Sequence, residues 1–128
     1  MRERCGVIVA HGELAEGFVS ALTRVAGPQK NLWALSNEGL SGEALLESLR
    51  SLLDERAGDR DIYLFVDLDG GSCGRICHRM LEDERVRAVF FGINLPLLIE
   101  FVFLEEQPHE KLVPLMLNKS RAAVGVRS

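Results

Sequence analysis

The chain has 128 residues, of which 47% are hydrophobic and 27% are charged, and its formal net charge is −4 at pH 7. This composition is that of an ordinary globular domain and excludes a disordered or fibrous chain. The acidic balance also excludes the clustered lysine and arginine footprint of a typical nucleic-acid-binding protein.

Strand and helix patterns alternate through the first half of the chain. Residues 5–10 form a continuous apolar run, as expected of a strand that is buried on both faces. From Glu13 the apolar residues recur at helical spacing, and Gly27-Pro28 ends that helix. A second strand is predicted at 31–36, followed by a second helix at 41–56 with Ser41 as its N-cap.

The alternation continues in the second half. A third strand at 61–67 leads into a glycine-rich loop and a third helix, and a fourth strand follows at 86–91. The fourth helix, at 97–105, is apolar on nearly all sides, so we expect a second layer of protein, such as a partner subunit, to cover it. Residues 111–117 are predicted to be one more strand, which Pro114 would confine to a sheet edge.

Four strand–helix repeats predict an α/β fold with a doubly wound, mostly parallel sheet and helices on both faces. The domain is expected to span residues 1–117, with a polar, mobile tail at 118–128. The strand order 2-1-3-4 would place strands one and three side by side, and ligands bind at the carboxyl ends of such strands. His11 follows strand one and Asp67 ends strand three, so the two side chains should face each other there.

A histidine held by a carboxylate keeps one ring nitrogen free as a general base, a metal ligand or a nucleophile. Gly12 would let the backbone approach His11 closely. The third helix begins at the segment Gly70, Gly71 and Ser72, whose backbone N–H groups suit a phosphate group. Ser72 adds a hydroxyl beside them. The combination predicts phosphoryl transfer through a phosphohistidine, although each residue alone is also common in purely structural roles.

The other histidines and the three cysteines are expected to be structural or solvated. An odd number of cysteines without an export signal indicates free thiols in a cytoplasmic protein. Cys73 and Cys77 have helix-face spacing beside His78, and with no second ligand pair we expect helix packing and no metal site. His78 and His109 are expected to face solvent.

Three motifs together resemble the mannose-family EIIA domains of the bacterial phosphoenolpyruvate:sugar phosphotransferase system (PTS). They are Gly-Val-Ile-Val-Ala-His-Gly-Glu-Leu-Ala-Glu at 6–16, Asp-Leu-Asp-Gly-Gly-Ser at 67–72 and Gly-Ile-Asn-Leu-Pro-Leu-Leu-Ile-Glu at 92–100. The motifs occur in the family's order and at similar spacing, and they cover residues 5 to about 105.

The resemblance implies a phosphocarrier for sugar uptake. His11 would accept a phosphoryl group from phospho-HPr and pass it to EIIB on a separate chain, with Asp67 orienting the ring and Ser72 helping to hold the group. No cofactor or metal would be needed, and the membrane would be reached only through the permease complex. The resemblance also implies a homodimer that exchanges an antiparallel C-terminal strand.

Two positions depart from the family pattern. Asp69 replaces the usual aromatic residue, and Cys73 replaces the usual proline. Arg75 would offset the charge of Asp69 or bind the phosphoryl group itself. These changes favour, as an alternative, an EIIA-like regulatory protein that reports the phosphorylation state of the PTS to a non-transport partner. A hydrolase built on the same pair is a more distant alternative, because the sequence shows no dedicated nucleophile for it.

Overall fold

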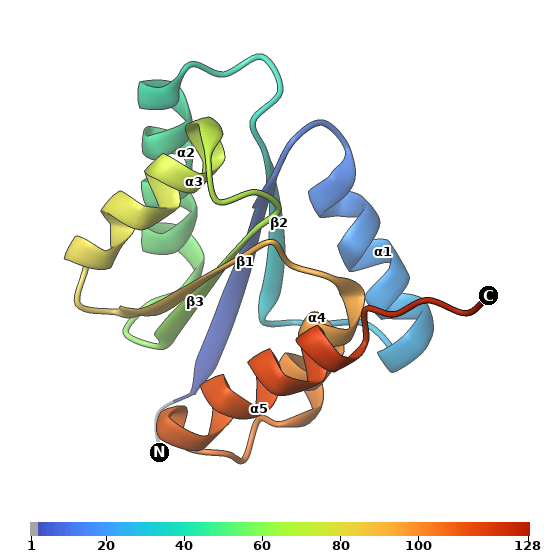
Figure 1. Ribbon diagram of the computed structural model, residues 1–128. Helices are drawn as coiled ribbons and strands as arrows, with labels where there is room; N and C mark the ends of the chain where they lie inside the picture. The colour runs from blue at the N-terminus through green and yellow to red at the C-terminus, as the bar shows by residue number, and fades with distance from the viewer. Residues whose placement is uncertain (1–2) are drawn as a thin grey trace.

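Four parallel strands form the central sheet of the computed structural model, which describes residues 3–128 (Figure 1). The strand order is β2-β1-β3-β4, so the predicted order 2-1-3-4 is confirmed. Every pairing between neighbours is parallel, and the sheet consists of β1 (Arg4–Ala10), β2 (Leu32–Ser36), β3 (Asp61–Val66) and β4 (Val86–Phe91). β1 and β3 are therefore neighbours, and their carboxyl ends lie together.

Helices cover both faces of this sheet (Figure 1). On one face, α2 (Gly42–Arg56), α3 (Gly71–Arg79) and the short 3-10 helix η1 (Met80–Glu82) enclose a core with one side of β1 and β3. On the other face lie α1 (Leu14–Ala26), α4 (Leu95–Phe103) and α5 (His109–Ala122). Within residues 3–128 no helix combines the length and apolarity that a membrane crossing requires.

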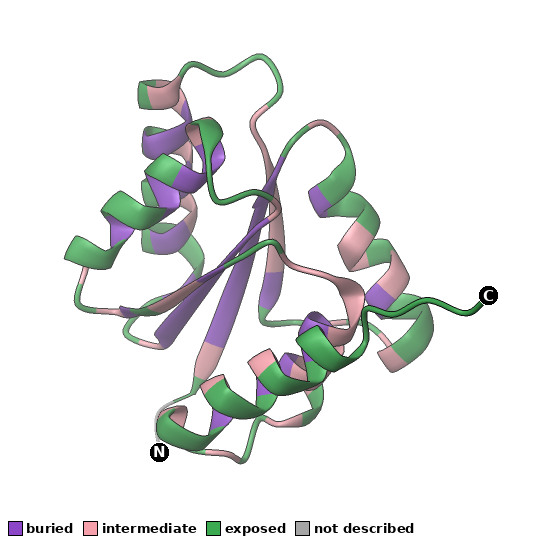
Figure 2. Cartoon of the chain, viewed as in Figure 1, coloured by how far each residue is buried: buried purple, intermediate pink, exposed green. Residues whose placement is uncertain are grey.

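The two central strands are buried along almost their whole length (Figure 2). Every residue of β3 is buried, and β1 is buried from Cys5 onwards. Continuous apolar runs produce this result because both faces of a central parallel strand are covered by helices. The buried strands thus fix the positions of the polar residues that follow them at their carboxyl ends.

The prediction of a C-terminal strand was wrong, because residues 111–117 lie inside α5. The apolar residues of this segment repeat at helical spacing and face α4 and the sheet: Leu112, Val113, Met116 and Leu117. Pro114 lies inside the helix on its exposed side, where it removes one backbone donor without entering the core. The helix continues to Ala122, so the predicted domain boundary after residue 117 falls within α5, and residues 124–128 are exposed without regular structure.

α5 also provides the cover that we expected a partner subunit to supply for α4. The two helices are in contact, and Leu97, Leu98 and Phe101 of α4 are buried. Asn94, the N-cap of α4, connects the start of α4 to the last turns of α5. Its Oδ1 accepts from the Leu97 N–H and the Ser120 hydroxyl, and its Nδ2 donates to the Ser120 carbonyl. The buried side of α4 is therefore covered within the chain, although Phe103 at its end remains 61% exposed, and a dimer remains a prediction.

His109 is part of the structure rather than a solvated side chain, so that prediction was wrong, whereas His78 is exposed as predicted. The His109 Nδ1 lies 2.8 Å from the hydroxyl of Tyr63, which is fully buried in the core. Burial lowers the pKa of His109 below its ordinary value of 6.5, and the positive charge of Arg87 acts in the same direction. The fold thus favours a neutral ring at this position.

We expect this histidine to make the fold less stable in mildly acidic solution. The unfolded chain binds a proton on His109 more readily than the folded chain does, so protonation favours unfolding as the pH falls below about 6.5. The free energy of unfolding, measured by urea denaturation between about pH 7.5 and pH 5, should fall less in His109→Asn than in the wild type. His78→Asn is the matched control and should keep the wild-type slope, while equal slopes in all three proteins would contradict the prediction.

Candidate functional site

The structure brings His11 and Asp67 together at the carboxyl ends of β1 and β3, as the predicted strand order requires. The Asp67 Oδ2 accepts two hydrogen bonds from His11, from the backbone N–H at 3.0 Å and from the ring Nδ1 at 2.9 Å. The other oxygen, Oδ1, accepts from the backbone N–H of Leu68 at 3.0 Å. The carboxylate is therefore held in place by backbone donors and in turn fixes the orientation of the imidazole.

The two members of the pair differ in their exposure to solvent. The His11 side chain is 44% exposed, whereas that of Asp67 is only 10% exposed. Burial by itself would raise the pKa of the Asp67 carboxyl, but the hydrogen bonds from the backbone and ring of His11 outweigh it and hold the pKa below its usual 3.8. An ionised carboxylate thus supports the ring from inside, while the ring itself meets the solvent.

With Nδ1 occupied by Asp67, the free nitrogen of His11 is Nε2. It points toward the start of α3, since a Cβ added to Gly71 would lie 3.9 Å from it. Gly71 has φ +78°, a conformation that side chains other than hydrogen rarely adopt. No side chain among residues 3–128 caps α3 at Gly70, so its first backbone N–H groups and the helix dipole are available to an anion beside Nε2.

The turn that carries His11 is tied to the end of β2, a feature that sequence reasoning missed. The Ser36 hydroxyl donates to the Gly12 carbonyl at 2.6 Å, and the Gly12 N–H donates to Asn37 Oδ1 at 3.3 Å. Gly12 has φ +58°, which suits the sharp turn from β1 toward α1. The sequence did carry a signal for this contact: Ser36 and Asn37 are polar residues at the end of β2, a neighbour of β1. The carboxyl ends of parallel strands meet at one edge of the sheet, so these residues were candidates for contact with the His11 turn.

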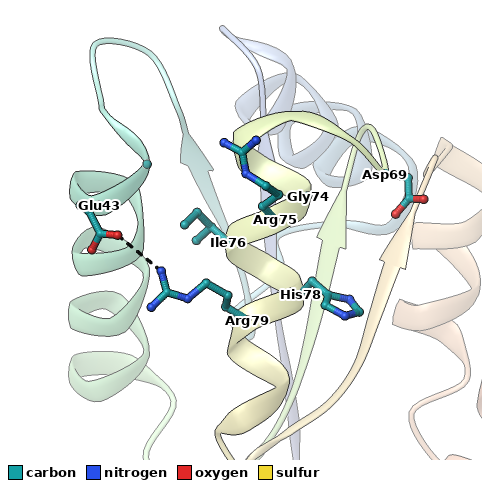
Figure 3. A pocket seen from close by; sticks show the side chains of 8 residues that line it. Glu43, Asp69, Gly74, Arg75, Ile76, His78 and Arg79 are labelled. Carbon is teal, nitrogen blue, oxygen red and sulfur yellow. Dashed lines mark hydrogen bonds and ion pairs between the residues drawn. The ribbon is translucent and has the colours of Figure 1, made fainter.

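Among residues 3–128, neither Ser72 nor Arg75 forms a hydrogen bond or ion pair with His11 or Asp67. The Ser72 side chain is half-buried and lies beside the thiol of Cys73. Arg75 and Asp69 both border a pocket of about 470 Å³ between α2 and α3 (Figure 3). No ion pair joins Arg75 and Asp69 among residues 3–128, so the compensation of the Asp69 charge by Arg75 stays a prediction.

Gly74 is a second residue that sequence reasoning missed. A Cβ at this position would lie 2.0 Å from the backbone oxygen of Asp69 and 3.0 Å from that of Leu68. The first turn of α3 thus lies directly against the loop that follows Asp67. Only a glycine allows this approach, so Gly74 sets the distance between the helix start and the carboxylate.

Cys73 completes a group of three side chains that could hold a metal ion. One ligand atom each from His11, Asp67 and Cys73 lies within 4.8 Å of the other two. The zinc interpretation weighed from the sequence concerned Cys73, Cys77 and His78, but the structure leaves His78 exposed and buries Cys77 in the core beneath α3. The cysteine that approaches the candidate site is Cys73 alone.

A doubly wound parallel sheet with a carboxylate-held histidine at its switch point, beside an uncapped helix N-terminus, defines an α/β protein with an exposed imidazole at the carboxyl edge of its sheet. The comparison with family models agrees with this class. The model for EIIA-man, described as the PTS system fructose IIA component, matches residues 6–114. The chain belongs to this EIIA family, the mannose family of the phosphotransferase system.

Individual relatives are similar along nearly the whole chain. The PTS system mannose-specific EIIAB component of Escherichia coli (strain K12) is 27% identical over 121 residues, which is 92% of this chain. The chain spans only 38% of the length of that relative. The activities and partners of the longer protein are therefore not transferred to this chain by the match alone.

Solved structures confirm the fold. The phosphotransferase system component EIIA from Streptococcus agalactiae has a TM-score of 0.82 at 24% identity, covering 96% of each chain. The mannose/sorbose specific IIA subunit from Enterococcus faecalis has a TM-score of 0.82 at 19% identity, covering 98% of this chain and 96% of that one. A sigma-54 interaction domain protein from Enterococcus faecalis, at 13% identity and a TM-score of 0.78 over 94% of this chain and 93% of that one, has the same fold.

Proposed function

We propose that the protein is a phosphocarrier of the sugar phosphotransferase system, in which His11 accepts a phosphoryl group from phospho-HPr and passes it to an EIIB protein. The observation that carries the proposal is the pair of hydrogen bonds from His11 to Asp67 Oδ2, which leaves Nε2 free beside the start of α3. Membership of the EIIA-man family supports the same reaction.

In this mechanism the lone pair of His11 Nε2 attacks the phosphorus of phospho-HPr. A new N–P bond forms as the bond from phosphorus to the HPr nitrogen breaks, and that nitrogen leaves with the electron pair. The Nδ1–H stays donated to Asp67, so the negative carboxylate stabilises the positive charge that the ring acquires. Transfer to EIIB repeats the exchange in the forward direction, with the EIIB nucleophile attacking the phosphorus.

The start of α3 would hold the phosphoryl oxygens during this exchange. Its backbone N–H groups, from the segment Gly70 to Ser72, have no side-chain cap, and the helix dipole favours negative charge there. Gly71 approaches Nε2 closely enough for its backbone to contact a group on that nitrogen. Gly12, the Ser72 hydroxyl and Arg75 are proposed as further contacts, and Arg75 borders the same pocket as Asp69 of the adjoining loop.

The test is a phosphorylation assay with phosphoenolpyruvate, enzyme I and HPr. The wild type should acquire an acid-labile phosphoryl group, and His11→Ala should acquire none, whereas His78→Ala should be labelled like the wild type because His78 is an exposed histidine away from the pair. Absence of label on a folded wild type with a cognate HPr would contradict the proposal. Label that never moves on to EIIB would instead favour the regulatory alternative.

We also propose that two copies of the chain associate through the edge of the sheet at β4. Among residues 3–128 no strand pairs with the outer side of β4, and Phe91 at its end is 60% exposed. A groove of about 360 Å³ lies alongside, between β4 and α5. Light scattering coupled to size-exclusion chromatography should give the mass of a dimer, and Phe91→Lys should give a monomer; a monomeric wild type at all concentrations would contradict this proposal.

A further inference from the structure

The proposed transfer reaction makes no use of Cys73, although this thiol lies next to the reacting pair. Cys73 is fully buried in the first turn of α3. Burial raises the pKa of its thiol to about 11, and the negative charge of Asp67 acts in the same direction, which reflects how near the two groups are. A neutral thiol therefore lies beneath the carboxylate that orients His11.

The three side chains offer the ligand types that zinc prefers. One nitrogen, one carboxylate oxygen and one sulfur lie within 4.8 Å of one another. Zinc bonds of about 2.0–2.3 Å in a tetrahedron place the ligand atoms roughly 3.3–3.7 Å apart. The His11 Nδ1 and Asp67 Oδ2 are 2.9 Å apart, so these two atoms have to separate slightly, and the thiol has to approach by about an ångström.

Exposure increases across the group from the thiol to the imidazole. Cys73 is inaccessible, the Asp67 side chain is 10% exposed and the His11 side chain is 44% exposed. The group is therefore open to solvent on the side of the His11 ring. Three protein ligands with one open position is the arrangement found in catalytic and inhibitory zinc sites rather than closed structural ones.

We propose that His11, Asp67 and Cys73 form a binding site for a thiophilic divalent cation, with Zn²⁺ as the best match. On binding, the thiol releases its proton to solvent and the thiolate sulfur bonds to the metal. The metal also takes the place of the Nδ1 proton that Asp67 Oδ2 accepts, and the neutral ring then carries its proton on Nε2. The soft sulfur ligand distinguishes this site from one for Mg²⁺ or Ca²⁺, which take oxygen ligands.

The consequence for phosphoryl transfer rests on the proposed function. A metal on the His11 ring and on Asp67 withdraws electron density from the imidazole and removes the carboxylate from its orienting role. With the ring proton on Nε2, that nitrogen has no lone pair left to attack phosphorus, so bound Zn²⁺ blocks phosphorylation of this histidine. Bound zinc would switch the carrier off without any change elsewhere in the fold.

The direct test measures metal binding without any phosphoryl donor. Co²⁺ serves as a coloured substitute for Zn²⁺, and the purified wild type should show an ultraviolet charge-transfer band from thiolate to cobalt that stoichiometric Zn²⁺ abolishes. Calorimetric titration with Zn²⁺ should give one site per chain. Cys73→Ser should lose the band and bind Zn²⁺ roughly 100-fold or more weakly, since it lacks the sulfur ligand.

Two cysteine controls separate the site from general thiol chemistry. Cys77→Ala removes the neighbouring buried thiol on the same helix, and Cys5→Ala removes the one in β1; both should keep the cobalt band. Circular dichroism identifies any variant that fails to fold. A wild-type cobalt spectrum without a thiolate band, or equal Zn²⁺ affinity of the wild type and folded Cys73→Ser, would overturn the proposal.

A second measurement links the site to transfer. Purified phospho-HPr, freed of enzyme I and Mg²⁺, is mixed with the protein in the presence or absence of Zn²⁺. Zn²⁺ should slow labelling of the wild type at least about tenfold at saturation and leave Cys73→Ser much less affected. Labelling without metal binding would overturn the zinc site and leave the carrier intact, whereas metal binding by a protein that takes no label would do the reverse.

Discussion

Replacing Asp67 with asparagine is expected to slow phosphoryl transfer to His11 by about 10²–10⁴-fold in a chain that still folds. The carboxylate accepts from the backbone N–H groups of His11 and Leu68 as well as from the His11 ring. An asparagine has only one carbonyl oxygen, so in either orientation its NH₂ group faces a backbone N–H donor. The ring then loses both its fixed orientation and the negative charge that stabilises the phosphorylated form.

Single-turnover labelling by phospho-HPr near neutral pH is the appropriate measurement. The pKa of Asp67 lies below its usual value, so the wild-type carboxylate is ionised throughout the assay. Asp69→Asn is the matched control: it makes the same change two residues away on an exposed side chain, and its transfer rate should equal or exceed that of the wild type. If Asp67→Asn transfers at the wild-type rate, Asp67 has no part in the mechanism.

Replacing Gly74 with alanine is expected to destabilise the fold by about 1–3 kcal/mol or more and to slow transfer as well. The added methyl group would lie 2.0 Å from the backbone oxygen of Asp69, and a backbone segment cannot move aside as a flexible side chain does. Either α3 or the loop after Asp67 has to shift. Both segments contact the candidate site, so the shift should disturb the geometry around Nε2.

The same substitution at Gly17 provides the comparison. Gly17 lies in the exposed middle of α1, and a Cβ there meets no atom within 4 Å. Gly17→Ala should therefore raise stability by about 0.5–1 kcal/mol, because alanine loses less backbone entropy in a helix. Urea denaturation of both variants should give shifts of opposite sign; a Gly74→Ala variant as stable as the wild type would show that the loop tolerates the contact.

Most of the architecture was predictable because the strands are buried on both faces. Continuous apolar runs at β1 and β3, separated by helical periodicity, leave few alternatives to a doubly wound sheet. The prediction of a strand at 111–117 was wrong for a reason that is equally physical. Pro114 argues against a helix interior, and only the packing of the face that carries Leu112 and Met116 onto α4 and the sheet outweighs that local preference.

The candidate site was predictable only where its residues sit at strand ends. His11 and Asp67 follow neighbouring strands, so the strand order alone places them together. Gly74 and Cys73 depend instead on how α3 docks against the preceding loop, which no spacing rule specifies.

The links from α5 back to Tyr63 and Asn94 have a consequence for synthesis on the ribosome. The sheet and the His11–Asp67 pair are complete in sequence by residue 91. His109, the partner of Tyr63, and Ser120, the partner of Asn94, emerge later. Until then, the nascent chain exposes the apolar side of α4 that α5 later covers. That interval is when trigger-factor-like chaperones should bind this domain, and release should coincide with the emergence of α5.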